Sequence, residues 1–213
     1  MATSNSPRPS RVPTAFEISQ LHDKAARDWL RLIKELDDEK RFRAREYAPL
    51  RKAIVAELHS PGTGQTVLEA ELLGYSAGKA TASMTTVMLE GFTKFLSGPR
   101  KHILEIKEDF VNYPAPIHVR IEPGEVRVTP HAMISHRRHG HCGLFAHASR
   151  YSESELAALQ EILLMAMEQK YPAEQCQLLW LDVRGGKTHL VKSRPRFRRL
   201  ISQTVELYQL LGL

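Results

Sequence analysis

The sequence predicts an α+β fold in which a helical first part is followed by a mixed β-sheet with two helices. Through most of residues 14–90 the apolar residues recur at three- and four-residue spacing, which is the period of amphipathic helices. Beyond residue 101 apolar and polar residues alternate over several short stretches, which is the period of half-buried strands, and two further helical patterns accompany them. With 213 residues the chain is long enough for one large domain or two small ones.

Four helices are expected in the first part, over about residues 14–38, 45–58, 66–73 and 77–90. Before them, residues 1–13 contain three prolines and no periodic pattern, and we expect a disordered leader. Thr14 and Glu17 have the spacing of a capping box at the start of the first helix. The turn "HSPGTG" ends the second helix, and residues 74–76 separate the last two.

The second part contains six strand patterns: "HILEIKEDF" (102–110), "IHVRI" (117–121), "EVRVT" (125–129), "HCGLFAHA" (141–148), "QLLWLDV" (177–183) and "THLVK" (188–192). Short turns join the second pattern to the third and the fifth to the sixth, so we expect two hairpins. Ser152 and Glu155 form another capping box, which begins a helix between the fourth and fifth patterns. Pro195 begins a final helix that runs to the C-terminus.

The chain carries an excess of positive charge. Thirty Lys and Arg against 24 Asp and Glu give a formal net charge of +6, which favours a polyanionic partner. Arginines are concentrated in "KRFRAREYAPLRK" (40–52) and "KSRPRFRR" (192–199), and their planar guanidinium groups pair well with phosphate. Such blocks are equally typical of a solvated helix face, so the charge alone leaves both interpretations open.

Nothing in the sequence indicates a membrane or an oxidising compartment. No apolar run reaches the roughly 18 residues that a membrane-spanning helix needs, and the N-terminus lacks the apolar core of a secretory signal. Cys142 and Cys176 are too few for a disulfide framework. We therefore expect a cytoplasmic protein with no membrane partner.

Residues 67–92, "VLEAELLGYSAGKATASMTTVMLEGF", have the spacing of a helix-turn-helix. In this interpretation Ala70 packs between the two helices, Gly74 turns the chain and Ser76 caps the second helix. The expected buried side of the second helix consists of Ala80, Met84, Val87 and Met88.

With the helix before it, this pattern resembles the winged helix-turn-helix DNA-binding superfamily over about residues 45–108, and residues 93–106 have the length and basic turn of its wing. The resemblance implies a DNA-binding region, residues 14–108, whose second helix lies in a groove of the duplex. The side chains it places toward DNA are Ser76, Lys79, Ser83, Thr85 and Thr86 on the helix and Arg100 and Lys101 in the wing. That helix has one basic residue and no Arg, Asn or Gln, so base reading would be weak. A structural helix pair and a protein-docking surface remain alternatives.

Five of the ten histidines lie within residues 131–147, "HAMISHRRHGHCGLFAH". On a strand His139 and His141 would point to one face, and a third ligand for zinc or another divalent metal could come from His131, His136 or Asp182. The Arg137–Arg138 pair adds positive charge where such a cation would sit. We therefore expect a basic surface that faces phosphate or a partner, with no cofactor, and keep the metal site as the alternative.

The strand "GLFAHA", the helix after it and the strand pair "QLLWLDV" and "THLVK" resemble the C-terminal half of the PD-(D/E)xK nuclease fold, in its RecB-like branch. Gln160 matches the glutamine on that family's helix. Ala146 and Ala148 stand where the family has Glu and Lys, so the resemblance implies a catalytically degenerate domain. For residues 109–213 we favour a generic α+β domain that dimerises or senses a ligand.

Together these features predict a DNA-binding protein, a transcriptional regulator with a C-terminal dimerisation or sensing domain. The expected partners are double-stranded DNA and a second copy of the chain, and further phosphate contacts are expected from Arg196, Arg198 and Arg199. The first alternative is a metal-dependent nuclease or phosphoesterase that uses the histidines of residues 131–147. The second is a non-enzymatic protein-binding adaptor. The sequence assigns no catalytic residue and leans against an enzyme.

Overall fold

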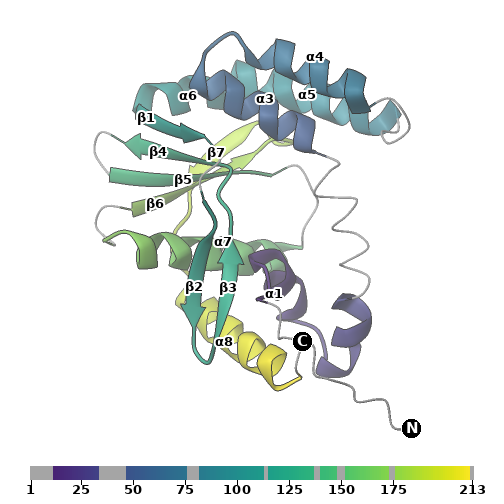
Figure 1. The fold of residues 1–213 in the computed structure, drawn as a ribbon, viewed down its shortest axis with the longest axis vertical. Coiled ribbons are helices and arrows are strands. Elements are labelled where there is room, and N and C mark those ends of the chain that lie inside the picture. The colour runs from purple at the N-terminus through teal and green to yellow at the C-terminus, as the bar shows by residue number, and fades with distance from the viewer. Residues whose placement is uncertain are drawn as a thin grey trace, which may run out of the picture.

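A five-stranded mixed sheet lies at the centre of the fold (Figure 1). The computed structural model describes residues 12–33, 47–75, 82–112, 115–136, 140–147, 152–172 and 176–211. The fold class is α+β, as predicted, because helices dominate the first half of the chain and the second half combines strands with two helices.

The strand order of this sheet is β1-β4-β5-β6-β7. Its members are β1 (Lys107–Asn112), β4 (Ala132–His136), β5 (Gly140–His147), β6 (Cys176–Asp182) and β7 (Lys187–Leu190). Neighbouring strands pair antiparallel except β5 and β6, which are parallel. A parallel pair needs a crossover connection, and helix α7 (Glu153–Lys170) provides it. The capping box predicted at Ser152 and Glu155 begins this helix.

Four helices lie on one side of the sheet (Figure 1). They are α3 (Ala48–His59), α4 (Gly64–Tyr75), α5 (Ala82–Ser97) and α6 (Pro99–Ile106). Their buried side chains share a hydrophobic core with one face of β4, β5 and β6. On α5 the buried residues Met88, Phe92 and Phe95 follow helical spacing, so this helix buries a single face.

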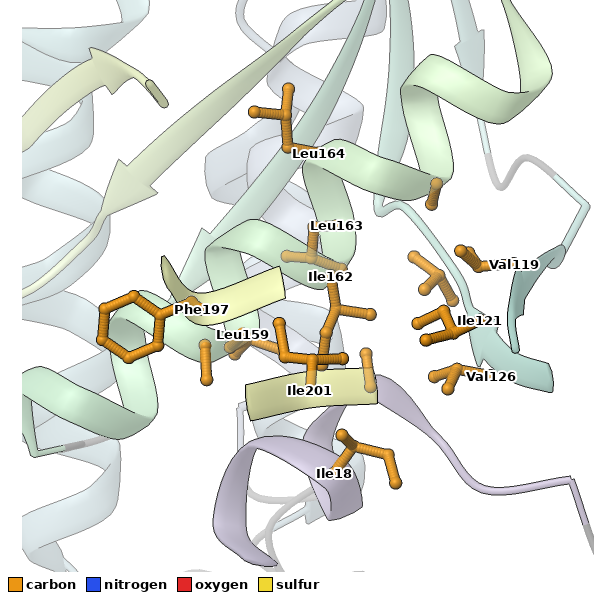
Figure 2. Packing of buried hydrophobic residues seen from close by; sticks show 14 of the residues in the cluster. Ile18, Val119, Ile121, Val126, Leu159, Ile162, Leu163, Leu164, Phe197 and Ile201 are labelled. Atoms are coloured by element: carbon orange, nitrogen blue, oxygen red, sulfur yellow. The ribbon is translucent and has the colours of Figure 1, made fainter. Parts of the chain in front are cut away.

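Helix α7 lies on the opposite side of the sheet and is itself buried on two sides. One side faces β6, and the other faces a layer made of α1 (Ala15–Leu21), α8 (Pro195–Leu210) and the predicted hairpin of β2 (Ile117–Ile121) and β3 (Gly124–Val128). Figure 2 shows apolar side chains of α7 converging with those of α1, α8 and the hairpin. A helix in this position must be apolar nearly all round, and the residues of α7 from Ala157 to Leu164 are all buried.

The N-terminal helix α1 packs with the second half of the chain. It contacts α7, α8 and β3, and the Arg127 N–H donates to the Pro13 carbonyl oxygen at 2.8 Å. Thr14 and Glu17 form the predicted capping box. Residues 14–108, predicted as one region, therefore contribute to two cores: α1 to the core around α7, and α3 to α6 to the core on the other side of the sheet.

The continuous helix predicted over residues 14–38 is wrong within the described residues. Helix α1 ends at Leu21, and after a turn the segment Ala26–Asp28 forms a short 3-10 helix that leads into helical residues 29–33. The Trp29 indole is 2% exposed and donates to the Lys24 carbonyl oxygen at 3.2 Å. This contact stabilises the turn, although the apolar period of the sequence continues across it.

Residues 93–106 do not form the predicted wing, and the strand predicted over residues 102–110 begins later than expected. Residues 93–97 end α5, residues 99–106 form α6, and β1 begins only at Lys107. Pro99 occupies the first turn of α6, where its missing N–H costs nothing, and Ile103 is fully buried. The sequence also failed to predict β4, because a central strand is buried on both faces and its residues 132–134 are all apolar instead of alternating.

Glu57 on α3 is a buried carboxylate that joins three helices. It is 3% exposed and accepts hydrogen bonds from the Gly62 and Gly64 N–H groups, which precede and begin α4. Arg100 on α6 donates to it at 2.6 Å. Burial alone would raise the pKa of Glu57, but the two amides and Arg100 outweigh burial and hold that pKa below its ordinary value.

We expect Glu57→Gln to lower the free energy of unfolding by about 1–2 kcal/mol at pH 7, because it weakens charge-assisted hydrogen bonds. Since the pKa of Glu57 is lowered in the folded state, its contribution is complete above the unfolded pKa of about 4.3 and is lost as the pH falls through the folded one. Urea unfolding should therefore show the two proteins converging in acid. Glu90→Gln on the exposed side of α5 is the control and should change stability by less than about 0.5 kcal/mol. A difference that stays constant from pH 7 into acid would contradict the assignment.

Candidate nucleic-acid interface

Residues 187–199, "KTHLVKSRPRFRR", form a continuous basic segment that runs from β7 into α8. The segment contains six Lys and Arg and no Asp or Glu. Among the described strands, β7 is at the edge of the sheet and pairs with β6 alone. Charged side chains on an edge strand prevent pairing with other chains, which accounts for Lys187 but not for the arginines that follow the strand.

The register of β7 places part of this charge on the α7 side of the sheet. Trp180 of β6 packs in the core around α7, and His189 pairs opposite it. Lys187 is two residues away and so lies on the same face. Gln160, the glutamine expected from the nuclease resemblance, is buried on α7 with its Nε2 3.4 Å from His189 Nε2. The basic segment therefore begins on the face of the sheet that α7 covers.

Glu161 on α7 fixes the point where the segment enters α8. This carboxylate is 1% exposed and accepts hydrogen bonds from the Ser193 hydroxyl at 3.0 Å and from the Arg194 N–H at 2.5 Å. Arg198 donates to it at 2.6 Å and also pairs with Glu168 at 2.8 Å. Helix α8 has no side-chain N-cap of its own, so Glu161 takes over part of that role from a neighbouring helix.

The remaining basic side chains of the segment face solvent. Arg198 is neutralised inside the protein, whereas the exposed members without an ion pair to any described residue are Lys187, Lys192, Arg194, Arg196 and Arg199. Of these, Arg196 lies over the ring of Phe197 at 5.1 Å, a contact that orients the guanidinium without neutralising it. The segment thus presents five uncompensated cations in thirteen consecutive residues.

A cavity of about 630 Å³ opens beside the segment, between the first turns of α7 and α8. Its lining consists of Glu153, Ser154, Ala157, Arg194, Pro195, Arg196 and Phe197. Two arginines and one glutamate give this lining a net positive charge, so a small anion is the ligand that its electrostatics favour.

The residues predicted for a helix-turn-helix reader are only partly described. Ser76 and Lys79 lie outside the described residues, as does Ala80, and Ser83 is described in its backbone alone. Thr85 is half-buried and Thr86 is exposed on α5.

The packing expected inside the helix-turn-helix is wrong at two positions. Ala70 is exposed instead of lying between helices, and Gly74 continues α4 without the positive φ of a turn. A Cβ at Gly74 would meet nothing within 4 Å, so this glycine is not required by close packing. On α5, Met88 is fully buried as expected, whereas Met84 and Val87 are only half-buried.

The two predicted wing residues have partners within the protein. Arg100 pairs with buried Glu57, and its side chain is 31% exposed. Lys101 is 84% exposed and lies 3.9 Å from Glu105 one helical turn away, which is a weak surface pair. Of the two, only Lys101 has a charge that a phosphate could reach freely.

The structure separates the predicted metal ligands that it describes. His131 donates its backbone N–H to Leu144, and its Nδ1 accepts the Ala146 N–H at 2.9 Å. His141 lies three residues before Leu144 on β5, a distance of about 10 Å along a strand, and stacks on Tyr171. His139 and the Arg137–Arg138 pair lie outside the described residues. Within the described ranges, no group of three His, Cys, Asp or Glu could hold a metal ion.

Three of the basic residues were missed by the sequence-based site, namely Lys187, Lys192 and Arg194. The signal was available, since the block "KSRPRFRR" contains two of them, but the sequence could not show which of its cations face solvent and which pair internally. That distinction depends on Glu161 and Glu168, which lie about thirty residues earlier on α7.

Removing the Glu161 carboxylate should destabilise the whole α7–α8 junction. We expect Glu161→Ala to lower the free energy of unfolding by about 3 kcal/mol, the low end for a broken buried pair, because Arg198 is partly solvated. Chemical denaturation at pH 7 measures this change. Glu206→Ala on the exposed side of α8 is the matched control and should have an effect within about 0.5 kcal/mol. Equal effects of the two substitutions would show that Glu161 does not hold the junction.

Comparison with known proteins adds no relative to this picture. No protein-family model, no curated protein and no solved structure matches the chain. Its function must therefore be inferred from its own surface, charge and hydrogen bonds.

Proposed function

We propose that this chain binds double-stranded DNA through the basic segment of residues 187–199. The observation that carries the proposal is the set of five exposed cations without a carboxylate partner, in a segment that contains no acid. Lysine and arginine in this arrangement contact phosphate oxygens, and they supply affinity more than sequence selectivity.

The described part of α5 offers a weaker surface for DNA. Its exposed residues include Leu89, Glu90 and Lys94, and the Lys94 ammonium group donates to the Arg184 carbonyl oxygen. This face has no surplus of positive charge. The proposed main contact is therefore the basic segment, and the helix-turn-helix residues such as Lys79 and Thr86 are proposed only as an auxiliary contact.

The nuclease alternative is less well supported by these residues. Such chemistry needs carboxylates clustered around a divalent ion. Ala146 occupies the position of the family's glutamate and is buried, while Asp182 accepts the Gly185 N–H in its own turn. We propose a DNA-binding protein that acts without cutting, as expected of a regulator.

The cytoplasm is the proposed compartment. No helix in the described part of the chain is long and apolar enough to cross a membrane. Both cysteines are buried, and burial raises the pKa of the Cys142 thiol to about 12. A buried thiol that stays protonated is poorly activated for disulfide formation, which suits a reducing compartment.

A second copy of the chain is the partner that we propose for α8. Beyond the basic segment this helix exposes four leucines, namely Leu200, Leu207, Leu210 and Leu211 at its end. Leu200, Leu207 and Leu211 recur at seven- and four-residue spacing and so share one face. An isologous α8–α8 contact would bury this face and bring two basic segments onto one duplex.

The DNA proposal predicts a steep salt dependence that a triple variant reduces. Changing Lys187, Lys192 and Arg199 to Ala should weaken duplex binding and make the slope of log K against log salt shallower by about 3. Fluorescence anisotropy at several salt concentrations measures both. The matched control changes Arg120, Arg127 and Lys170, which lie on the hairpin and at the end of α7, and removes the same charge. Equal losses from both variants would mean that net charge alone attracts DNA and would overturn the proposed surface.

The dimer proposal is tested by mass in solution. Leu207→Glu with Leu211→Glu should convert a dimer into a monomer in sedimentation equilibrium, because it places charges in the shared apolar face. Leu73→Glu, at a still more exposed leucine on α4, should leave the mass unchanged. A monomeric wild-type protein, or a dimer that survives the double substitution, would contradict the assignment.

A further inference from the structure

His22 and Ser154 form a hydrogen-bonded pair between α1 and α7. Their atoms Nε2 and Oγ lie 2.8 Å apart, and His22 Nδ1 lies 2.7 Å from the Ser19 carbonyl oxygen. A carbonyl oxygen can only accept, so Nδ1 carries the ring proton of the neutral imidazole. Nε2 is then the basic nitrogen and accepts the Ser154 hydroxyl proton. This is a nucleophile, a base and an orienting group in sequence, the arrangement that activates serine in covalent catalysis.

The pair lies beside a cavity of suitable size. Ser154 lines the 630 Å³ cavity between α7 and α8. The His22 ring is 6.1 Å from the ring of Phe197, which lines the same cavity. Both His22 and Ser154 are partly exposed, so a ligand in the cavity can reach the hydroxyl while the imidazole remains packed.

The first turn of α7 can stabilise negative charge next to the hydroxyl. The Glu155 N–H is already bonded to the Ser152 hydroxyl of the capping box. The Glu153 and Ser154 N–H groups have no acceptor among the described residues. They are positioned to donate to an oxygen that becomes negative when Ser154 attacks, aided by the positive end of the helix dipole.

The cavity lining also indicates the class of substrate. Arg194 and Arg196 line the cavity, and neither forms an ion pair with any described residue. Glu153 on the other side of the lining is the single opposing charge. A carboxylic ester that carries a separate anionic group, a carboxylate or a phosphate, would place that group at the arginines and its carbonyl carbon at Ser154.

We propose that His22 and Ser154 form a serine-hydrolase dyad that acts on small anionic esters. Ser154 Oγ attacks the ester carbonyl carbon while His22 Nε2 takes the hydroxyl proton. The ester C–O bond then breaks, and the departing alkoxide receives that proton from His22 and leaves as the alcohol. Water, deprotonated by His22, attacks the acyl-serine. The acid is released and the Ser154 hydroxyl is restored, so one ester and one water give one acid and one alcohol.

This activity does not depend on DNA binding, although the two proposals share Arg194 and Arg196. The test is therefore made on the full chain without DNA, with a fluorophosphonate probe that bonds to activated serines and releases fluoride. We expect stoichiometric labelling, which peptide mass spectrometry locates at Ser154 and which Ser154→Ala abolishes. Ser202→Ala removes a surface hydroxyl on α8 that donates to the Glu122 carbonyl oxygen, and it should leave labelling unchanged.

His22→Gln separates catalysis from structure. The glutamine amide can still hydrogen-bond to Ser154 but cannot act as a base, so labelling should slow by about 100-fold or more while the thermal melt is retained. A hydrogen bond that only joins α1 to α7 predicts instead that folded wild-type protein is not labelled at Ser154, or that His22→Gln is labelled as fast as wild type. Either result would overturn the dyad, and the first does so even if the variant fails to fold.

The proposed preference for anionic esters is tested by comparing two substrates. Hydrolysis of p-nitrophenyl hemisuccinate, which is anionic, should have a lower KM than hydrolysis of neutral p-nitrophenyl acetate. The double variant Arg194→Ala with Arg196→Ala should raise KM for the anionic ester and so remove that preference. Equal use of both esters by the wild type would show that the arginines do not select the substrate.

Discussion

Helix α7 is packed between the central sheet and a layer formed by α1, α8 and the β2–β3 hairpin, and this burial on two sides determines where the other elements lie. The helix connects two parallel strands, so it must cross the sheet, and Gly143 lets it approach closely because a Cβ there would lie 2.8 Å from Met167 Sδ. The first and last described helices, α1 and α8, contact each other on its far side, where they cover what would otherwise be exposed apolar surface (Figure 1). The basic segment and the cavity both lie against this helix.

Two buried glutamates join the helices by the same physical rule. Glu57 and Glu161 each sit on one helix, accept backbone N–H groups near the start of another and receive an arginine. A buried carboxylate is tolerated only when such donors compensate its desolvation. Because Arg100 and Arg198 pair with these glutamates, their charges are neutralised within the protein. The other cations of the basic segment stay available for a partner. The net charge of the chain therefore overstates its accessible positive charge, because arginines in internal ion pairs cannot bind a partner.

The sequence predicted the features that depend on neighbouring residues. The capping boxes at Thr14 and Ser152 and both hairpins are local, and the structure confirms them. The sequence could not predict β4, whose two-sided burial hides the alternation of a strand, or the helical α6, whose apolar residues suit either period. At the candidate site, the sequence located the arginine block of residues 192–199 but could not show that Arg198 pairs with glutamates of α7. The His22–Ser154 contact joins residues 132 apart in the chain, so no local pattern could reveal it.

Lysine footprinting can test whether DNA contacts the proposed surface at the edge of the sheet and the start of α8. Acetylation of the intact protein, with and without a short duplex, reports how far each lysine is covered when DNA is bound. We expect strong protection of Lys187 and Lys192, whereas Lys101 on α6 and Lys170 on α7 should be as reactive with DNA as without it. Protection of Lys79 and Lys101 while Lys187 and Lys192 stay reactive would contradict the account and return the DNA contact to the helix-turn-helix.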